Sequence, residues 1–494
     1  MSHPSTGTRA LLAAIAASVL LAGCSTSGSP PQSAAAGEVA TAPQATEMDA
    51  YLRAAVAYDQ FSGTVLVARD GVPVFVRSYG MANYELAVAN SPDTVFRIAS
   101  LTKQFTAAAI MHLQERGRLN IDDPICWHLD NCPATWRSIT IRQLLSHTSG
   151  IPNFSSLPDW DERLSVAYYP PTEFVGLFRD LPLQFEPGSD FRYSNSGYFL
   201  LGLIIERASG QTYTAYLQEN IFGPLGMART GHYDDRRLIP GIADGYDWAA
   251  NGFVNAEYNS NVVPDGGGGL YSTVGDLLRW DQALYSNRLL SEQSLQAIFT
   301  PVRNNYGFGW TIQERFGRSL QGHSGSDVGF STFLARFPSE RLTVIVLSNS
   351  DRTSASKAAL MLAAIALGED YELPTEQLHD ALWRVLLADG APAALAHLRA
   401  AHQAAPDAAE EHEEALNEFG YELLGSGRTA EAISFFQLGT ELFPNSANAY
   451  DSLGEAYLRG GQRAEAIRNY ERSLALDPEN ANAERVLRDL RSRP

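Results

Sequence analysis

The stretch SLTKQFTAAAIMHLQERG, residues 100–117, has the apolar spacing of an amphipathic helix that begins near Ser100 and ends at Gly117. Ser100 and Lys103 are three residues apart, so a helix places both side chains on one face, one turn apart. A lysine can take the proton of a serine only if burial or a nearby charge lowers its pKa. The free N–H groups of a helix N-terminus also favour negative charge at the serine. The pair therefore predicts a nucleophile with its base.

Lysine is rare in this chain. Two of the 37 lysine and arginine residues are lysines, Lys103 and Lys357, and each follows a serine by three residues. Arginine cannot act as a base in the same way, because its guanidinium stays protonated. Ser354 and Lys357 begin a second helix-like stretch close to the end of the domain, with no chemical motif after it. We interpret this second pair as a helix cap followed by a surface lysine.

Two further motifs follow Ser100-x-x-Lys103. Tyr193-Ser194-Asn195 begins 93 residues after Ser100, and His323-Ser324-Gly325 begins 130 residues after Tyr193. The surrounding phrases include ITIRQLLSHTSGIP, FEPGSDFRYSNSGYFLLG, GGGGLYSTVGDL and YGFGW. With these motifs in this order, residues 50–350 resemble the superfamily of serine β-lactamases and D-alanyl-D-alanine carboxypeptidases. They are most similar to the class C branch and its esterase relatives.

The resemblance implies the chemistry of the first two motifs. Ser100 would attack a carbonyl carbon and form an acyl-enzyme, while Lys103 and Tyr193 would share the proton transfers. The sequence leaves open which of these two is the general base. Asn195 would hold the substrate amide and steady Lys103. No cofactor and no metal is expected in such a site.

The resemblance also implies how the substrate is held. His323, Ser324 and Gly325 would orient it, with His323 also helping to orient Tyr193 and facing a substrate carboxylate. The backbone N–H groups of Ser100 and Ser326 would form the oxyanion hole. Class C β-lactamases usually have Lys-Thr-Gly in place of His323-Ser324-Gly325, and a neutral histidine holds a carboxylate less firmly than an ammonium. This difference favours a carboxypeptidase or an esterase over a β-lactamase.

The order of predicted elements indicates an α+β domain over residues 48–372. The run FSGTVLVARDGVPVFVRSYG, residues 61–80, reads as two strands joined at Asp70-Gly71, and LTVIVLSN, residues 342–349, reads as a buried strand. A helical, loop-rich middle separates them, so the two ends are expected to share one sheet. The resemblance implies an antiparallel sheet flanked by helices, with a helical subdomain.

Residues 373–494 are expected to form an all-α domain that contains a repeat. Residues 415–446 align with residues 447–480, and four pairs of matching residues are 34 apart: Gly420 and Gly454, Ala432 and Ala466, Phe436 and Tyr470, Pro444 and Pro478. This period and these small and aromatic positions resemble tetratricopeptide repeats. The sequence leaves open whether this domain is a structural appendage or binds a protein partner.

The N-terminus is typical of an exported lipoprotein. Residues 1–24 contain a short apolar run and end in LAGC, which resembles a lipobox with Cys24 as the lipidated residue. Residues 25–47, rich in Ser, Pro, Gly and Ala, are expected to form a flexible tether. We expect a membrane anchor that faces the periplasm, in the outer membrane of a Gram-negative bacterium, because Ser25 follows the cysteine.

Two cysteines remain, Cys126 and Cys132 in CWHLDNC. An oxidising compartment favours a disulfide between them over free thiols, and His128 adds too few ligands for a closed zinc site. The net charge of −19 argues against nucleic acid as a partner.

The sequence therefore predicts a serine hydrolase that acts on a small amide or ester, such as a D-amino-acid peptide of the cell-wall type. A β-lactamase or esterase of the same fold is the first alternative. A non-catalytic scaffold that acts through its repeats is the second.

Overall fold

The computed structural model describes residues 37–492, apart from Asp159, 161–163, Val166, Tyr168, 250–251 and 258–265. The predicted export signal, Cys24 and the first part of the predicted tether lie outside the described residues. In the described part of the chain, no helix combines the length and the apolar character that a membrane-spanning segment needs.

The tether predicted over residues 25–47 is too long. Strand β1, Val39–Ala40, pairs antiparallel with strand β3, Val72–Tyr79, and helix α1 covers Ala45–Ala57. These two residues give the outer edge of β3 hydrogen-bond partners. Backbone pairing of this kind cannot be predicted from amino-acid composition. The prediction was therefore wrong for residues 39–47.

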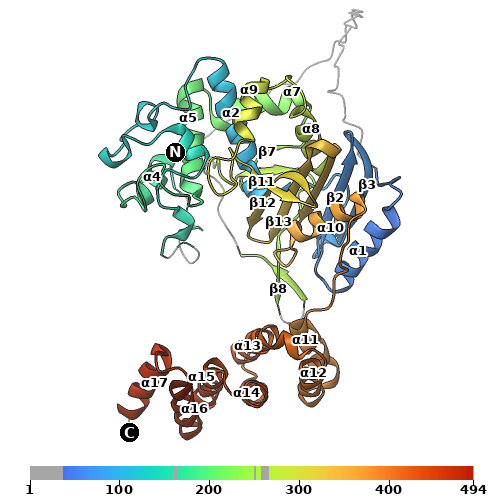
Figure 1. Cartoon of the computed structure of the whole chain (residues 1–494), viewed down its shortest axis with the longest axis vertical. Coiled ribbons are helices and arrows are strands. Elements are labelled where there is room, and N and C mark those ends of the chain that lie inside the picture. Colours follow the sequence, from blue (N-terminus) through green and yellow to red (C-terminus); the bar gives the residue numbers. More distant parts are fainter. Residues whose placement is uncertain are drawn as a thin grey trace, which may run out of the picture. The chain divides into compact units, whose positions relative to one another are not determined.

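A seven-stranded antiparallel sheet forms the centre of the hydrolase domain, in the order β1-β3-β2-β14-β13-β12-β11. Its remaining strands are β2 (Gly63–Arg69), β11 (Thr311–Arg315), β12 (Arg318–Asp327), β13 (Phe330–Phe337) and β14 (Leu342–Ser348). β2 pairs with β14, so strands from the two ends of the domain are neighbours, as the sequence predicts. Figure 1 shows β2 and β3 beside the later strands of this sheet.

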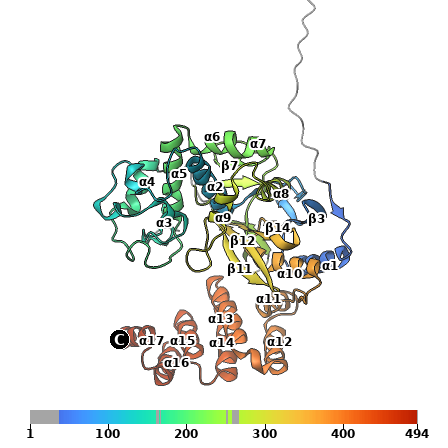
Figure 2. The same ribbon diagram turned by 45° about the horizontal axis from the view of Figure 1, so that its top comes forward.

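Helices cover both faces of the sheet. Side chains alternate along β2, so Val65 and Val67 pack with α1 and α10 (Ala355–Leu367), while Leu66 and Ala68 belong to the larger core that contains α2 (Thr102–Glu115) and α8 (Val274–Ala283). Because both faces are buried, the strands read as continuous apolar runs rather than as alternating patterns. Figure 2 shows α1 and α10 on the same side of this domain.

A helical subdomain adjoins α2. It contains α3 (Ile141–Leu145), α4 (Pro171–Arg179), α5 (Asn195–Ser209) and α6 (Tyr213–Leu217), all of which contribute to the core around α2. A small sheet in the order β6-β10-β7 lies next to the start of α2, with β6 at Phe96–Arg97, β10 at Leu270–Ser272 and β7 at Gly231–His232. The chain thus enters α2 from an ordered strand.

The C-terminal region is entirely helical within its described residues. It consists of α11 (Leu378–Asp389), α12 (Ala391–Ala404), α13 (Ala409–Gly425), α14 (Thr429–Leu442), α15 (Ala447–Arg459), α16 (Arg463–Leu476) and α17 (Ala481–Ser492). The repeat seen in the sequence corresponds to a repeated contact. A Cβ atom added at Gly420 would lie 2.4 Å from the Phe436 ring, and one at Gly454 would lie 3.1 Å from the Tyr470 ring. In each helix pair a glycine leaves room for an aromatic ring.

Candidate active site

Ser100 lies at the start of the helix that the sequence predicts. A 3₁₀ turn, Ala99–Leu101, leads directly into α2. Ala99 has a φ of 46°, a left-handed conformation that is uncommon for a residue other than glycine. Strained backbone of this kind persists where the surrounding structure holds it, and it concentrates at functional sites. Ser100 is half-buried and lines a cavity.

Lys103 is fully buried one turn further along, and polar atoms surround its Nζ atom. It lies 3.1 Å from Ser100 Oγ, 2.7 Å from Asn195 Oδ1 and 2.7 Å from the carbonyl oxygen of Gly267. The two carbonyl oxygens can only accept hydrogen bonds. A neutral lysine would therefore give both of its N–H groups to Asn195 and Gly267, and its lone pair would face the Ser100 hydroxyl. The geometry fits a lysine that takes the serine proton.

Asn195 is the first residue of α5, and local hydrogen bonds fix its position. Ser194 is the N-cap, and its hydroxyl accepts a hydrogen bond from the backbone N–H of Gly197. The backbone N–H of Asn195 donates to Asn153 Oδ1 at 3.0 Å, and its Nδ2 donates to Ser155 Oγ at 3.2 Å. These contacts orient the side-chain oxygen toward Lys103.

Tyr193 lies just before α5, with its ring against Lys103 and His147. The centre of the Tyr193 ring lies 4.7 Å from the Lys103 Nζ atom and 4.3 Å from the centre of the His147 ring. The backbone on both sides of Tyr193 is bonded to His147. The N–H of Arg192 donates to the His147 carbonyl oxygen at 3.0 Å, and the N–H of Ser194 donates to His147 Nδ1 at 3.2 Å. His147, which lies within the phrase ITIRQLLSHTSGIP, therefore holds Tyr193 in position.

His147 is kept in its acceptor form by its surroundings. It is buried, and burial together with the nearby Lys103 holds its pKa well below the ordinary value. A neutral ring whose Nδ1 accepts a hydrogen bond carries its proton on Nε2. The residue also has a φ of 57°, so the tight turn in SHTSG presents both its carbonyl and its ring to the 192–194 segment.

His323 lies on β12, close to Tyr193, with a ring-centre distance of 6.1 Å. Its Nδ1 lies 2.6 Å from the carbonyl oxygen of Ser324, so Nδ1 carries the proton, and its Nε2 accepts from the hydroxyl of Tyr306 at 2.9 Å. Burial lowers the pKa of His323 to about 4, and Lys103 acts in the same direction. Both ring nitrogens are therefore engaged, and the ring is neutral at pH 7.

Strand β12 approaches the start of α2 closely at Gly325. A Cβ atom added at Gly325 would lie 2.4 Å from the carbonyl oxygen of Ile98, which only a glycine avoids. Thr332, opposite Gly325 on β13, donates a hydrogen bond to the same oxygen at 3.1 Å. This contact places the third motif beside the first. Ser326, one residue further on, lines the same cavity as Ser100.

The cavity beside Ser100 has a volume of about 340 Å³. Ser100, Asn195 and Ser326 line it, together with several large apolar residues: Phe154, Trp160, Leu164, Phe174 and Phe199. One residue of each of the first two motifs, and Ser326 directly after the third, thus line the same recess. Gly267 and Tyr306 complete the polar contacts. They lie within GGGGLYSTVGDL and YGFGW, two phrases on which the resemblance rests, but the letters alone give them no role.

The second serine–lysine pair is not part of this site. Ser354 is at the N-cap position of α10 but makes no side-chain capping bond, and Lys357 is exposed. The surface position of Lys357 and the N-cap position of Ser354 agree with the prediction, although the Ser354 hydroxyl makes no capping hydrogen bond.

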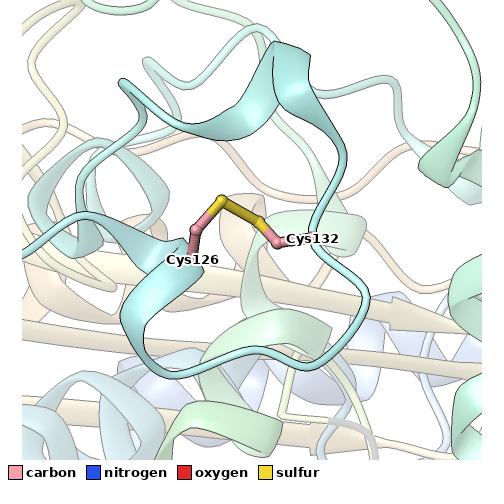
Figure 3. The surroundings of a disulfide bond; sticks show 2 residues. All are labelled: Cys126 and Cys132. Atoms are coloured by element: carbon pink, nitrogen blue, oxygen red, sulfur yellow. A yellow bond between two sulfur atoms is a disulfide. The ribbon is translucent and has the colours of Figure 1, made fainter.

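Cys126 and Cys132 form a disulfide, which closes a short loop before α3 (Figure 3). His128, inside that loop, is bonded through Nε2 to Asp123 Oδ2 at 3.2 Å. Within the described residues no group of His, Cys, Asp and Glu side chains is arranged to hold a metal ion.

Comparison with known families gives two matches. A family model described as Beta-lactamase matches residues 48–367, and one described as Tetratricopeptide repeat matches residues 447–480. The chain is 36% identical over 343 residues to penicillin-binding protein 4* of Bacillus subtilis, a match that covers 64% of this chain and 74% of that protein.

Two solved structures are similar over the hydrolase domain. A penicillin-binding protein from Bacillus halodurans is 32% identical with a TM-score of 0.58, covering 64% of this chain and 98% of that one. A D-stereospecific amidohydrolase from Streptomyces is 26% identical with a TM-score of 0.57, covering 66% of this chain and 99% of that one.

Proposed function

The chain belongs to the beta-lactamase family and carries a tetratricopeptide repeat, and we propose that it hydrolyses a small amide or ester through an acyl-enzyme on Ser100. The observation that carries this proposal is the environment of Lys103. Its Nζ atom is within hydrogen-bond distance of Ser100 Oγ, while Asn195 and Gly267 each take one of its N–H groups. A lysine bonded in this way is prepared to act as a base rather than as a counter-ion.

The reaction has two balanced steps. In the first, Lys103 takes the proton of Ser100, Oγ bonds to the substrate carbonyl carbon, and the leaving nitrogen or oxygen departs with that proton. In the second, water gives its hydroxyl to the acyl carbon and its remaining proton returns to Ser100. The backbone N–H groups of Ser100 and Ser326 would stabilise the oxyanion in both steps, and one such donor is typically worth ~3–4 kcal/mol.

Tyr193 would assist in moving the proton to the leaving group. Its ring lies against Lys103, and His147 and the neighbouring backbone bonds hold it there. In this assignment Lys103 is the base toward Ser100, and Tyr193 passes the proton on. His323 supports Tyr193 from β12 and stays neutral.

We propose substrates built from D-amino acids, as in cell-wall peptides. Two relatives support this class: one is named a penicillin-binding protein and another a D-stereospecific amidohydrolase. The stereochemical preference is tested by comparing D- and L-aminoacyl p-nitroanilides.

The proposal is tested by pre-steady-state hydrolysis of p-nitrophenyl acetate. We expect a burst of nitrophenol equal to the enzyme concentration, followed by slower turnover, because acylation and hydrolysis are separate steps. Ser100→Ala should abolish the burst. An unchanged burst in that variant would place the chemistry elsewhere.

A penicillin then separates the alternatives within the family. A long-lived adduct on Ser100 indicates a penicillin-binding peptidase, and rapid consumption of the drug indicates a β-lactamase. Ester or amide turnover with no adduct indicates an esterase or amidase. A chain that turns over none of these substrates would support the scaffold alternative.

We also propose that the protein is an exported lipoprotein anchored through Cys24 to the outer membrane and that its helical repeats bind a protein partner. The apolar run and LAGC at residues 11–24 support the anchor. Cys24→Ser should move the protein from the membrane fraction to the soluble periplasmic fraction. A membrane-bound Cys24→Ser variant would exclude the anchor.

A further inference from the structure

Residues 266–270, referred to below as the glycine segment, supply one of the hydrogen-bond acceptors of Lys103. The carbonyl oxygen of Gly267 lies 2.7 Å from Lys103 Nζ. The segment is packed between α2 and α5. A Cβ atom added at Gly266 would lie 2.6 Å from the carbonyl oxygen of Tyr198 on α5 and 3.3 Å from Cγ2 of Thr106 on α2. A glycine is required for so close an approach, so neighbouring residues must hold this backbone in place.

Three polar side chains of α2 contact the glycine segment. Lys103 bonds the carbonyl oxygen of Gly267, and the hydroxyl of Thr102 accepts a hydrogen bond from the backbone N–H of Leu270 at 3.1 Å. The hydroxyl of Thr106 donates to the carbonyl oxygen of Gly266 at 2.7 Å. Residues three and four apart are neighbours on a helix surface, so one side of α2 makes all three contacts.

The neighbours of the Thr106 hydroxyl set its direction. The hydroxyl has one proton to give, and a carbonyl oxygen can only accept. The carbonyl oxygen of Gly266 is closer to Thr106 Oγ1 than that of Thr102, at 2.7 Å against 3.4 Å. The hydroxyl oxygen of Tyr213 lies 2.7 Å from Thr106 Oγ1, so with the threonine proton on Gly266 the tyrosine donates to the threonine. Thr106 is fully buried, which keeps water from competing for these bonds.

The hold on Gly266 also restricts Gly267. The Gly266 carbonyl belongs to the peptide unit that joins the two residues, so a hydrogen bond to its oxygen fixes the plane from which Gly267 continues. Glycine adopts a wide range of backbone angles, and the next carbonyl would otherwise be able to turn away from Lys103. Thr106 therefore acts on Lys103 through the backbone of the glycine segment.

We propose, on the basis of the acyl-enzyme chemistry above, that Thr106 is a positioning residue for Lys103. Its hydroxyl holds the Gly266 carbonyl, and this contact keeps the Gly267 carbonyl in place as the acceptor of one Lys103 N–H. With that acceptor in place, the lone pair of the neutral amine stays directed at Ser100. Loss of the hydroxyl would leave the nucleophile and its base present but would free the amine to turn.

The first test removes the hydroxyl and keeps the shape of the side chain. For the full chain acting on p-nitrophenyl acetate, we expect kcat/KM to fall ~10-fold or more in Thr106→Val and to stay within ~3-fold of wild type in Thr106→Ser. Thr64→Val is the matched control. Thr64 is also a buried threonine, and its hydroxyl also joins another hydroxyl, that of Ser78 at 3.0 Å, to a backbone carbonyl, that of Ser91 at 3.0 Å.

The pH dependence of kcat/KM separates positioning from packing. A carbonyl acceptor stabilises the ammonium form of Lys103 more than the amine, so a variant that loses the Gly267 contact gives up this proton more easily. The acid-side midpoint should therefore move about 0.5–1 pH unit lower in Thr106→Val and stay in place in Thr106→Ser and Thr64→Val. Among the described residues, the titratable groups that the structure places near Lys103 are Tyr193, Tyr198, His147 and His323. These variants leave all four side chains unchanged.

The outcomes separate this inference from the proposed function. A Thr106→Val variant with wild-type kcat/KM would overturn the inference, and so would lower activity with an unmoved acid-side midpoint, because the threonine would then contribute packing alone. Either result leaves the hydrolase intact when wild-type turnover needs Ser100. If Thr106→Val does not fold, Thr106→Ala makes the same comparison, since it removes the hydroxyl and adds no atom. Failure of the wild-type protein to turn over any ester or amide would overturn the proposed function and this inference together.

Discussion

The Nδ1 atom of His147 accepts a hydrogen bond from the backbone N–H of Ser194, 3.2 Å away, and its carbonyl oxygen accepts another from Arg192. One buried histidine thus fixes the chain on both sides of Tyr193. Its ring also lies against the tyrosine ring, with 4.3 Å between ring centres. The contacts with His147 and the start of α5 together fix the position of Tyr193.

His147→Asn should therefore lower kcat far less than His147→Ala does. Asparagine tolerates a left-handed backbone, and its side-chain oxygen can accept the Ser194 N–H. We expect kcat to fall ~10- to 100-fold in His147→Ala with a small change in KM, and to stay within ~3-fold of wild type in His147→Asn. Kinetics and melting temperatures are measured together, with His112→Asn as a control at a buried histidine outside the site. Equal kcat values for the two His147 variants would contradict the role in positioning Tyr193.

Lys103→Arg should abolish activity although the charge of the side chain is kept. A guanidinium stays protonated and cannot take the Ser100 proton. We expect kcat/KM for p-nitrophenyl acetate to fall by ~10³-fold or more. Lys357→Arg is the matched control, because Lys357 is the other lysine of the chain and is exposed. Comparable activity of the two variants would exclude Lys103 as the base.

Acid should destabilise the hydrolase domain through His323. Burial lowers its pKa to about 4, while in the unfolded chain a histidine has a pKa of ~6.5. Between these pH values the unfolded chain binds a proton that the folded chain does not, so stability falls as the pH is lowered through this window. Over the whole pH range between the two pKa values, the free energy of unfolding falls by roughly 3 kcal/mol.

Thermal melting of His323→Gln at pH 7 and pH 4.5 measures this effect. We expect a smaller loss of stability on acidification than in wild type. Part of the loss should remain, because burial also lowers the pKa of His147, which is still present. An identical loss in both proteins would show that His323 is not the group that titrates.

Gly420→Ala should destabilise the helical region, although alanine normally favours a helix over glycine by ~1 kcal/mol. The added Cβ atom would lie 2.4 Å from the Phe436 ring and would force the two helices apart. We expect a loss of ~1–3 kcal/mol in the free energy of unfolding. Gly425→Ala, in the same helix with no atom within 4 Å of its Cβ, is expected to be neutral or stabilising. A stabilising Gly420→Ala would contradict the glycine–aromatic contact.

The sequence predicted the residues that would act directly in the proposed reaction, but not the residues that hold them in position. Ser100 and Lys103 could be found because helix geometry alone puts residues three apart on one face. His147, Gly267 and Tyr306 make contacts that depend on segments far apart in the chain, so no local spacing reveals them. The predicted tether was too long for the same reason, because β1 depends on pairing with a strand more than 30 residues away. Strand β1 exists because the edge of β3 is open, and Val39–Ala40 by itself has no strand pattern.

A covalent intermediate on Ser100 can be detected by intact-mass spectrometry. The protein is mixed with p-nitrophenyl phenylacetate and is quenched in acid within the first turnover. We expect a mass gain of one phenylacetyl group that maps by peptide analysis to Ser100, is absent in Ser100→Ala and persists in Lys357→Arg. Ester hydrolysis without any adduct, or an adduct on another residue, would contradict it.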